Sequence, residues 1–386
     1  MKQLLFILFI ISLLVSSGCN KNKTDDNSQK LGLLALAIPQ PSTGSSTTTT
    51  TTTTTDVYSG GYSSNSSGIP VAGYWKNETW TGLTPLDTSK SSMVHSMVVS
   101  GSDVYAAGFS TNSSNVPVAG YWKNGTWTAV TPQDSTKDNR IYSFLVSGSD
   151  MYATGYRTNS FDVKVPGYWK NGTWTSLTPL ATSKDSRIYS IVVSGSDVYA
   201  AGYSTNSSNV PVPGYWKNGT WTGLAPLDST KDSYVVSLAV SGSDVYAGGY
   251  STNSSSVLVA GYWKNGTWTA VTPLDSTKNS SVYSIVVSGS DVYAAGYSAN
   301  SSSVQVAGYW KNGTWTGLTP LDTSKASIVY FNSMTVSGSD VYAAGYSTNS
   351  SNVGVPGYWK NGTWKELTTL DSTKSSYVQS IFVTTY

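Results

Sequence analysis

The chain contains only three arginines, and all of them fall between Arg140 and Arg187. Arg140 and Arg187 occupy matching places in consecutive copies of a repeat, and Arg157 lies between them. Phe161 and Lys164 also depart from the Ser-Ser-Asn-Val-Pro of other copies. A guanidinium presents a planar fork of donors that suits carboxylate or sulfate groups. These residues therefore suggest an anion-preferring binding patch, and the alternative is drift in one duplicated copy.

Aromatic side chains that could stack on a sugar recur in a fixed order. The segment Gly-Tyr-Trp-Lys-Asn-Gly-Thr-Trp, read at Gly120 to Trp127, has seven close copies. Their first tryptophans are Trp75, Trp122, Trp169, Trp216, Trp263, Trp310 and Trp359. In every copy these aromatic residues lie at the same distance from the same turn. This favours their burial between repeat units, where aromatic rings contribute large contact areas. A sugar-stacking array is the alternative.

Carboxylates recur in six Ser-Gly-Ser-Asp turns. They belong to Asp103, Asp150, Asp197, Asp244, Asp291 and Asp340. A ring of carboxylates could hold calcium, which prefers oxygen ligands. Aspartate in such a turn more often bonds the backbone amides of its own turn. We therefore expect caps and no metal site.

Groups with a tunable pKa are scarce, which limits the chemistry of the chain. It has one histidine (His95), one cysteine (Cys19) and two glutamates (Glu78 and Glu366). Catalysis, metal binding and disulfides all need several such groups in convergent positions. We expect no catalytic residues and no cofactor, and we interpret His95 as a neutral substitution. The net charge of +2 also argues against nucleic-acid binding, which needs a basic face.

The elements that position these residues follow from the repeat period. Successive first tryptophans are 47 residues apart, except for a last interval of 49, and such periods are typical of propellers and solenoids. The unit from Tyr283 to Lys325 contains four strand-like runs, the first being Tyr283 to Ser288. Asn312-Gly313 predicts a two-residue hairpin between the last two runs, because both residues accept positive φ. Each unit should form one four-stranded antiparallel blade.

The two ends of the repeat region complement each other. The region opens at Asp56 without a first run, and the chain ends in a first run, Tyr377 to Val383, without a second. Residues 56–386 hold seven units of 47 residues and a two-residue insertion near Tyr330 to Asn332. Pairing the last run with the first blade would remove free sheet edges. We predict an all-β, seven-bladed β-propeller closed by its C-terminal strand.

The blade motifs resemble those of kelch-type β-propellers over the whole repeat region. An apolar first run is followed by Val-Tyr-Ala-Gly-Gly at Val245 to Gly249, and later in the unit by Trp-Thr-x-Leu-x-Pro. The glycine doublet is complete only there and at Gly60-Gly61, and Lys90 and its equivalents replace the kelch arginine. The resemblance implies four-stranded blades with the first run lining a central channel and the fourth run outermost.

The N-terminus has the features of an exported lipoprotein. Met1 to Gly18 contains Lys2, an apolar run from Leu4 to Val15 and small residues. This is the pattern of a secretory signal peptide, and the run is too short to span a bilayer. The junction before Cys19 resembles a bacterial lipobox, with Ser16 where leucine is commoner. We expect lipid on Cys19 to anchor the protein in the bacterial cell envelope, at the outer membrane or cell surface; the alternative is an ordinary signal peptide and a stray cysteine.

Residues 19–55 have the composition of a tether. They include a short apolar piece, Leu31 to Ile38, and nine consecutive threonines, Thr47 to Thr55. Such low-complexity sequence buries too little apolar surface to offset its ordering entropy. The predicted organisation is a signal peptide (1–18), a lipidated, threonine-rich disordered tether (19–55) and a propeller (56–386).

These features favour a monomeric binding or display module that is held at the membrane by its lipid. The expected partner is a protein or an acidic glycan, and the expected contacts are Arg140, Arg157, Phe161, Lys164 and Arg187. One alternative is a hydrolase or lyase acting on sugars at the channel mouth. Another is a structural surface protein whose near-identical repeats permit variation in copy number.

Overall fold

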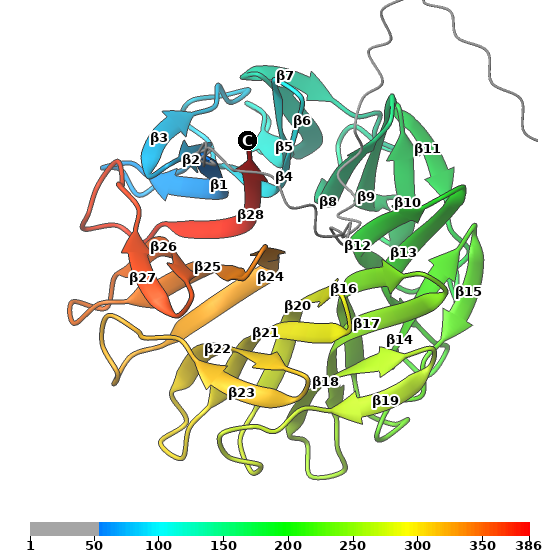
Figure 1. The fold of residues 1–386 in the computed structure, drawn as a ribbon. Coiled ribbons are helices and arrows are strands. Elements are labelled where there is room, and N and C mark those ends of the chain that lie inside the picture. The colour runs from blue at the N-terminus through cyan, green and yellow to red at the C-terminus, as the bar shows by residue number, and fades with distance from the viewer. Residues whose placement is uncertain (1–53) are drawn as a thin grey trace, which may run out of the picture. The chain divides into compact units, whose positions relative to one another are not determined.

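The repeat region folds into a ring of seven sheets. The computed structural model describes residues 54–386, and the strands of this part form seven four-stranded antiparallel sheets. Figure 1 shows the sheets arranged around a common centre, like the blades of a propeller. The predicted all-β, seven-bladed fold is confirmed.

The strands of each blade take four positions, from the centre of the ring to its rim. The innermost strands are β4 (Ser92–Ser100), β8 (Asn139–Ser147), β12 (Ser186–Ser194), β16 (Ser233–Ser241), β20 (Ser280–Ser288), β24 (Ser327–Ser337) and β28 (Tyr377–Thr385). The second strands are β1 (Thr55–Ser64), β5 (Asp103–Thr111), β9 (Asp150–Thr158), β13 (Asp197–Thr205), β17 (Asp244–Thr252), β21 (Asp291–Ala299) and β25 (Asp340–Thr348).

The outer half of each blade is shorter than the inner half. The third strands are β2 (Pro70–Lys76), β6 (Pro117–Lys123), β10 (Lys164–Lys170), β14 (Pro211–Lys217), β18 (Leu258–Lys264), β22 (Gln305–Lys311) and β26 (Gly354–Lys360). The outermost are β3 (Thr79–Gly82), β7 (Thr126–Ala129), β11 (Thr173–Ser176), β15 (Thr220–Gly223), β19 (Thr267–Ala270), β23 (Thr314–Gly317) and β27 (Thr363–Glu366). We number the blades from 1 (β28 with β1 to β3) to 7 (β24 to β27).

Blade 1 is assembled from two segments that lie far apart in the sequence. β28 pairs antiparallel with β1, so that Val57 faces Val383 and Tyr58 faces Phe382. Val378 and Ile381 of β28 are buried in one cluster with Trp75 of the same blade. The predicted closure by the C-terminal strand is therefore confirmed. It covers an edge of β1 that would otherwise present unpaired backbone groups.

The hairpin between the third and outermost strands has the predicted geometry. Asn124 and Gly125 have φ angles of 49° and 83°, both in the left-handed region that a type I′ turn requires. The Asn124 side chain also accepts a hydrogen bond from the backbone amide of Val104, at 2.9 Å. One residue therefore shapes the turn and ties it to the second strand.

The first tryptophan of each repeat joins its blade to the preceding one. Trp122 is fully buried, and its Nε1 donates a 2.8 Å hydrogen bond to the carbonyl oxygen of Thr84 in the loop after blade 1. The other six first tryptophans make the same bond to the loop before their blade. Burial between blades, rather than sugar stacking, is confirmed for these residues.

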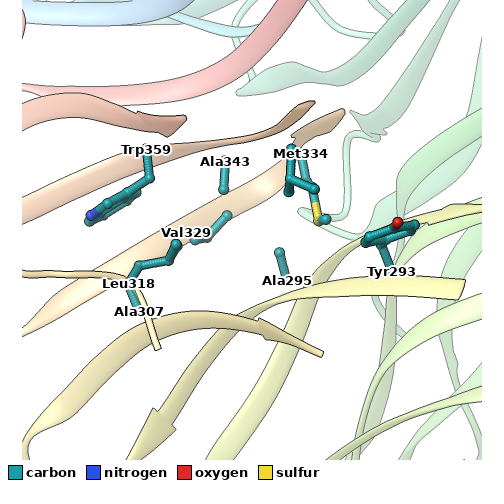
Figure 2. Packing of buried hydrophobic residues seen from close by; sticks show 9 residues of the cluster. Tyr293, Ala295, Ala307, Leu318, Val329, Met334, Ala343 and Trp359 are labelled. Carbon is teal, nitrogen blue, oxygen red and sulfur yellow. The ribbon is translucent and has the colours of Figure 1, made fainter. Parts of the chain in front are cut away.

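Figure 2 shows the packing between blades 6 and 7. Small residues of the second strands and large residues of the neighbouring blade share one cluster, which includes Tyr293, Ala295, Leu318, Val329, Met334 and Trp359. A buried valine, leucine or methionine side chain contributes about 1.5–3 kcal/mol. Since each blade repeats this arrangement, the apolar contacts between blades stabilise the whole ring.

The two faces of the ring differ in their chemistry. The turn face carries the tight turns that follow the innermost and third strands, and the loop face carries the longer connections. On the turn face Asp103 accepts hydrogen bonds from Lys123 and from Asn124, both at 2.7 Å. The other six blades repeat this ion pair. The carboxylates thus link two turns, which corrects the expectation that each caps its own turn.

The described chain enters the ring on the turn face. The backbone amide of Tyr386 donates to the carbonyl oxygen of Thr54 at 3.0 Å, and Thr55 pairs with Thr385 at the turn-face end of β1. The loop face is therefore opposite to the point of entry.

Of the two innermost strands predicted with bounds, β28 begins at Tyr377 as predicted, and β20 begins earlier. β20 starts at Ser280 rather than at Tyr283, and its pairing with β21 skips Tyr283. This β-bulge interrupts the alternation of side chains, which conceals the first part of the strand in the sequence. The Ser280 hydroxyl accepts a hydrogen bond from the amide of Ala260 at 3.0 Å, so a polar residue is well placed at the strand start.

Candidate functional site

Every innermost strand is irregular in its loop-face half, where a bulge changes the direction of a side chain. In six strands the residue without a partner in the ladder is His95, Tyr142, Tyr189, Val236, Tyr283 or Gln379. We refer to these six as the bulge residues. The His95 and Tyr142 rings are 5.4 Å apart, and the Tyr142 and Tyr189 rings are 5.2 Å apart. His95, Tyr142 and Tyr189 therefore form a chain of contacts across three consecutive blades.

The seventh innermost strand, β24, contains the two-residue insertion. Its Phe331 ring is 4.6 Å from Tyr283, edge to face, and 6.0 Å from Tyr189. Asn332 has a φ of 50°, and its Nδ2 donates to the carbonyl oxygen of Tyr189 at 3.0 Å. Blade 7 thereby contacts blade 4 across the ring. The insertion places aromatic side chains at the centre that a regular repeat would not supply.

Arg140 and Arg187 lie at corresponding positions of β8 and β12, two residues before the bulges. The Arg140 guanidinium carbon is 4.5 Å from the ring centre of Phe109, and that of Arg187 is 5.4 Å from Tyr156. Each ring belongs to the preceding blade, and such contacts contribute about 0.5–1 kcal/mol at exposed sites. Tyr156 also lies opposite Arg140 in the β8–β9 register. Both arginines are therefore neighbours of Tyr156.

Asp138 holds one of these arginines and the tyrosine. Its carboxylate accepts from Arg140 Nε at 3.1 Å and from the Tyr156 hydroxyl at 2.7 Å. Burial acts to lower the pKa of Arg140, but Asp138, together with the ionised forms of Tyr156 and Tyr142, outweighs this effect and the pKa is raised. Burial also raises the pKa of Tyr156, which keeps its hydroxyl a donor. We call Asp138, Arg140, Tyr142, Tyr156 and Arg187 the arginine cluster.

Arg187 is the member of the cluster with an unused donor. It forms no ion pair with residues 54–386, and its buried Nε has no hydrogen-bond partner among them. Burial acts to lower the pKa of Arg187, but the negative charge that Tyr203, Tyr189 and the other nearby tyrosines carry when ionised outweighs burial, and the pKa is raised. A buried donor without a partner costs about 1–3 kcal/mol. An acceptor supplied by a ligand would therefore be stabilised at this position.

His95 lies beside the arginine cluster, because Phe109 contacts both His95 and Arg140. His95 Nδ1 is 2.5 Å from Gln379 Oε1, so Nδ1 carries the proton and the amide oxygen accepts. Burial lowers the pKa of His95 to about 4. Its Nε2 is buried without a partner in the described chain. A neutral His95 can therefore accept a hydrogen bond next to the cluster.

Arg157, the third predicted arginine, lies apart from the other two. Successive side chains of a strand point to opposite faces, so Arg157 is directed away from its neighbour Tyr156. Its guanidinium carbon lies 5.1 Å from the ring centre of Trp174 in the same blade, and burial lowers its pKa. The structure therefore brings Arg140 and Arg187 together and separates Arg157 from them.

The remaining predicted residues lie at the loop between β9 and β10. Phe161 is 84% exposed, and a surface phenylalanine of this exposure is available for contact with a partner. Lys164 pairs with Asp185 at 3.1 Å and lines a 360 Å³ pocket with Val165, Leu177 and others. The charge of Lys164 is thus already balanced within the chain.

Sequence reasoning missed three residues of the cluster and gave His95 no role. Asp138 precedes Arg140 by two residues, as Asp185 precedes Arg187, and this repeated spacing was the available signal. The sequence could not single out Tyr142 and Tyr156 as members of the cluster, because tyrosines occupy the same positions in other blades as well. Within residues 54–386 there is no group of three or more His, Cys, Asp or Glu residues that could hold a metal ion.

Comparison with known proteins relates the chain to solved structures at low identity. One is a provisionally assigned 6-phosphogluconolactonase from Bacteroides uniformis, with 16% identity, 86% of this chain and 99% of that chain covered, and a TM-score of 0.44. Another is an arginine-to-alanine mutant of AofleA from Arthrobotrys oligospora, with 13% identity, coverage of 86% and 93%, and a TM-score of 0.40. No family model and no curated protein matches the chain.

The predicted signal peptide, the lipid site Cys19 and almost all of the tether lie outside the described residues. Of the part that is described, no helix has the length and hydropathy needed to cross a membrane.

Proposed function

We propose that this protein is a lipid-anchored, extracytoplasmic binding and display module that recognises an acidic partner, glycan or protein, on its loop face. Binding without catalysis is part of the proposal. The carrying observation is the arginine cluster: two cations from adjacent blades flank Tyr156, and Arg187 keeps an unpartnered Nε. Hydrogen bonds that involve a charged group contribute about 1.5–3 kcal/mol each.

The packing of the two guanidiniums supports recognition of a defined ligand shape. Each guanidinium lies over an aromatic ring, so less side-chain freedom is lost when a carboxylate or sulfate binds. His95 Nε2 and the exposed Phe161 add an acceptor and an apolar contact on the same side of the ring. A ligand with an acidic group and hydroxyls would use all three kinds of contact.

The point where the chain enters the ring supports display of the loop face to a partner. The described chain enters on the turn face, where Thr54 contacts Tyr386. A lipid on Cys19, followed by the predicted tether, would therefore attach to the face opposite the arginine cluster. The kelch-type assignment belongs to the same proposal, and it is supported by the blade motifs such as Val245 to Gly249.

The test is a glycan and protein array probed with the full chain, followed by titration of any ligand found. Replacing Arg140 and Arg187 by glutamine should weaken binding about tenfold for each guanidinium that is removed, which corresponds to ~1.4 kcal/mol. Binding should also weaken with salt, because accessible charges are screened. Arg157→Gln is the matched control and should leave the affinity unchanged, since Arg157 lies over Trp174.

Two results would replace this proposal. Equal affinity of the parent and the Arg140→Gln, Arg187→Gln variant would place recognition elsewhere on the ring. Release of shorter sugars from an array glycan, measured as new reducing ends or unsaturated ends, would favour the hydrolase or lyase alternative. An array without any ligand would favour the structural surface protein.

A further inference from the structure

A second candidate site lies on the loop face of blade 6, away from the arginine cluster in blades 3 and 4. It is a cavity of about 420 Å³ between three loops, and its lining includes Lys278, Gln305 and Lys325. Small-molecule sites usually have volumes of about 300–1,000 Å³. The cavity is therefore large enough for a small ligand.

The corresponding place in blade 3 is occupied by two ion pairs. Lys137 Nζ binds Asp162 Oδ1 at 2.7 Å, and Lys164 Nζ binds Asp185 Oδ2 at 3.1 Å. Each pair joins the loop between the second and third strands to a loop that precedes an innermost strand. The side chains of these four residues bridge the loops that flank the blade.

Blade 6 lacks both carboxylates at the matching positions. Ser303 stands where blade 3 has Asp162, and Ala326 stands where it has Asp185. Gln305 replaces Lys164, while Lys278 is the counterpart of Lys137 and keeps its charge. All four residues line the cavity. No ion pair of this kind crosses the cavity, and among residues 54–386 only blade 3 has such pairs.

Two further substitutions distinguish the lining of the cavity in blade 6. Ala299 lines it at a position that is threonine in five other blades. Asn279 replaces Asp138 of blade 3, and its Oδ1 accepts a hydrogen bond from the backbone amide of Leu258 at 3.0 Å. Tyr297, the counterpart of Tyr156, therefore has no carboxylate beside its hydroxyl as Tyr156 has.

The lining has the charge and donors for a specific class of ligand. It includes two lysines and no aspartate or glutamate, and neither Lys278 nor Lys325 forms an ion pair within residues 54–386. Ser303, Ser324 and Gln305 add hydroxyl and amide groups. We propose that this cavity binds a small hydroxylated carboxylate of the hexuronic acid type, independently of the arginine cluster.

The experiment is calorimetric titration of the full chain, in detergent, with glucuronate, glucose and acetate. Glucuronate should bind, and both other probes should bind at least about tenfold more weakly. Glucose lacks the carboxylate that the lysines attract, and acetate lacks the hydroxyls that the serines and Gln305 bind. No binding of glucuronate, or equal binding of acetate, would overturn the proposal.

Ser303→Asp combined with Ala326→Asp tests the location, because it restores the two carboxylates of blade 3. Glucuronate affinity should fall at least about tenfold while the melting temperature is kept, since the new side chains add charge and fill the cavity. The control is Asn115→Asp with Asn209→Asp, which adds two carboxylates to the equivalent loops of blades 2 and 4 and leaves the lining of the cavity unchanged. Loss of affinity in the control as well would show that general charge decides binding, which contradicts the proposal.

The variant Arg140→Gln, Arg187→Gln separates this proposal from the proposed function. It should keep the glucuronate affinity of the parent, because the cavity in blade 6 contains neither arginine. Loss of glucuronate binding in that variant would move the site to the arginine cluster and overturn the present proposal. If the array reveals no ligand but glucuronate binds, the proposed function fails and the proposal for the cavity stands.

Discussion

His95 occupies a bulge position where three other blades have tyrosine, and it is the only histidine of the chain. Neutral His95 is compatible with its surroundings, because its Nδ1 proton is used by Gln379 and its Nε2 is buried. Protonation would place a charge near Arg140, which lowers the pKa, and near Asp138, which raises it. Burial dominates, and the pKa in the folded protein is about 4, compared with 6.5 for a free side chain.

This difference predicts a loss of stability in mild acid. Between pH 6.5 and about 4 the unfolded chain binds a proton at His95 and the folded chain does not, so stability falls as the pH falls through this window. The loss is at most about 3 kcal/mol. His95→Tyr, which introduces the bulge residue of three other blades, should remove it. Chemical denaturation of parent and variant at pH 7.5 and pH 4.5 checks this, and an equal pH dependence would contradict it.

Among the strands, β28 is the one on which closure depends. It supplies the innermost strand of blade 1 and buries Val378 and Ile381. A chain that ends at Lys374 should lose about 1.5–3 kcal/mol for each of these side chains. It should also expose an edge of β1 that promotes association. We expect aggregation, or a much lower melting temperature, measured by light scattering and calorimetry.

A circular permutant is the control for this truncation. If residues 375–386 are joined in front of Thr54 through a flexible linker, blade 1 contains the same strands with a different connection. The permutant should remain a soluble monomer with nearly the stability of the parent. A truncated chain that is equally stable and monomeric would show that β28 is dispensable.

For the molecule as a whole, the proposed anchor decides whether the ring is held at a membrane. Cys19→Ala should move the protein from the membrane fraction to the soluble fraction, because the lipid would have no attachment site. The propeller should keep its melting temperature, since residues 54–386 contain the complete ring. Fractionation without detergent and immunoblotting check the result. An equally membrane-bound variant would contradict lipidation at Cys19, and a His95→Tyr chain serves as the folded, anchored control.

The architecture could be predicted from the sequence, because the relevant signals are local and repeated seven times. Asn124-Gly125 specifies its turn through backbone preferences that need no distant contact. The complementary ends at Asp56 and Tyr386 indicated how the ring closes. The predicted start of β20 was three residues late, because the bulge at Tyr283 interrupts the alternation on which the prediction relied.

Tertiary packing was needed to show which charged residues act together. Arg140, Arg157 and Arg187 look equivalent in the sequence, but strand alternation and the packing of blade on blade direct Arg157 away from the other two. The cavity of blade 6 could not be predicted from the sequence either. Ser303 and Ala326 line it only because the fold brings three loops together. The physical reason is the same in both cases. Such sites depend on contacts between neighbouring loops and blades, and a repeat pattern does not report where side chains of different units point.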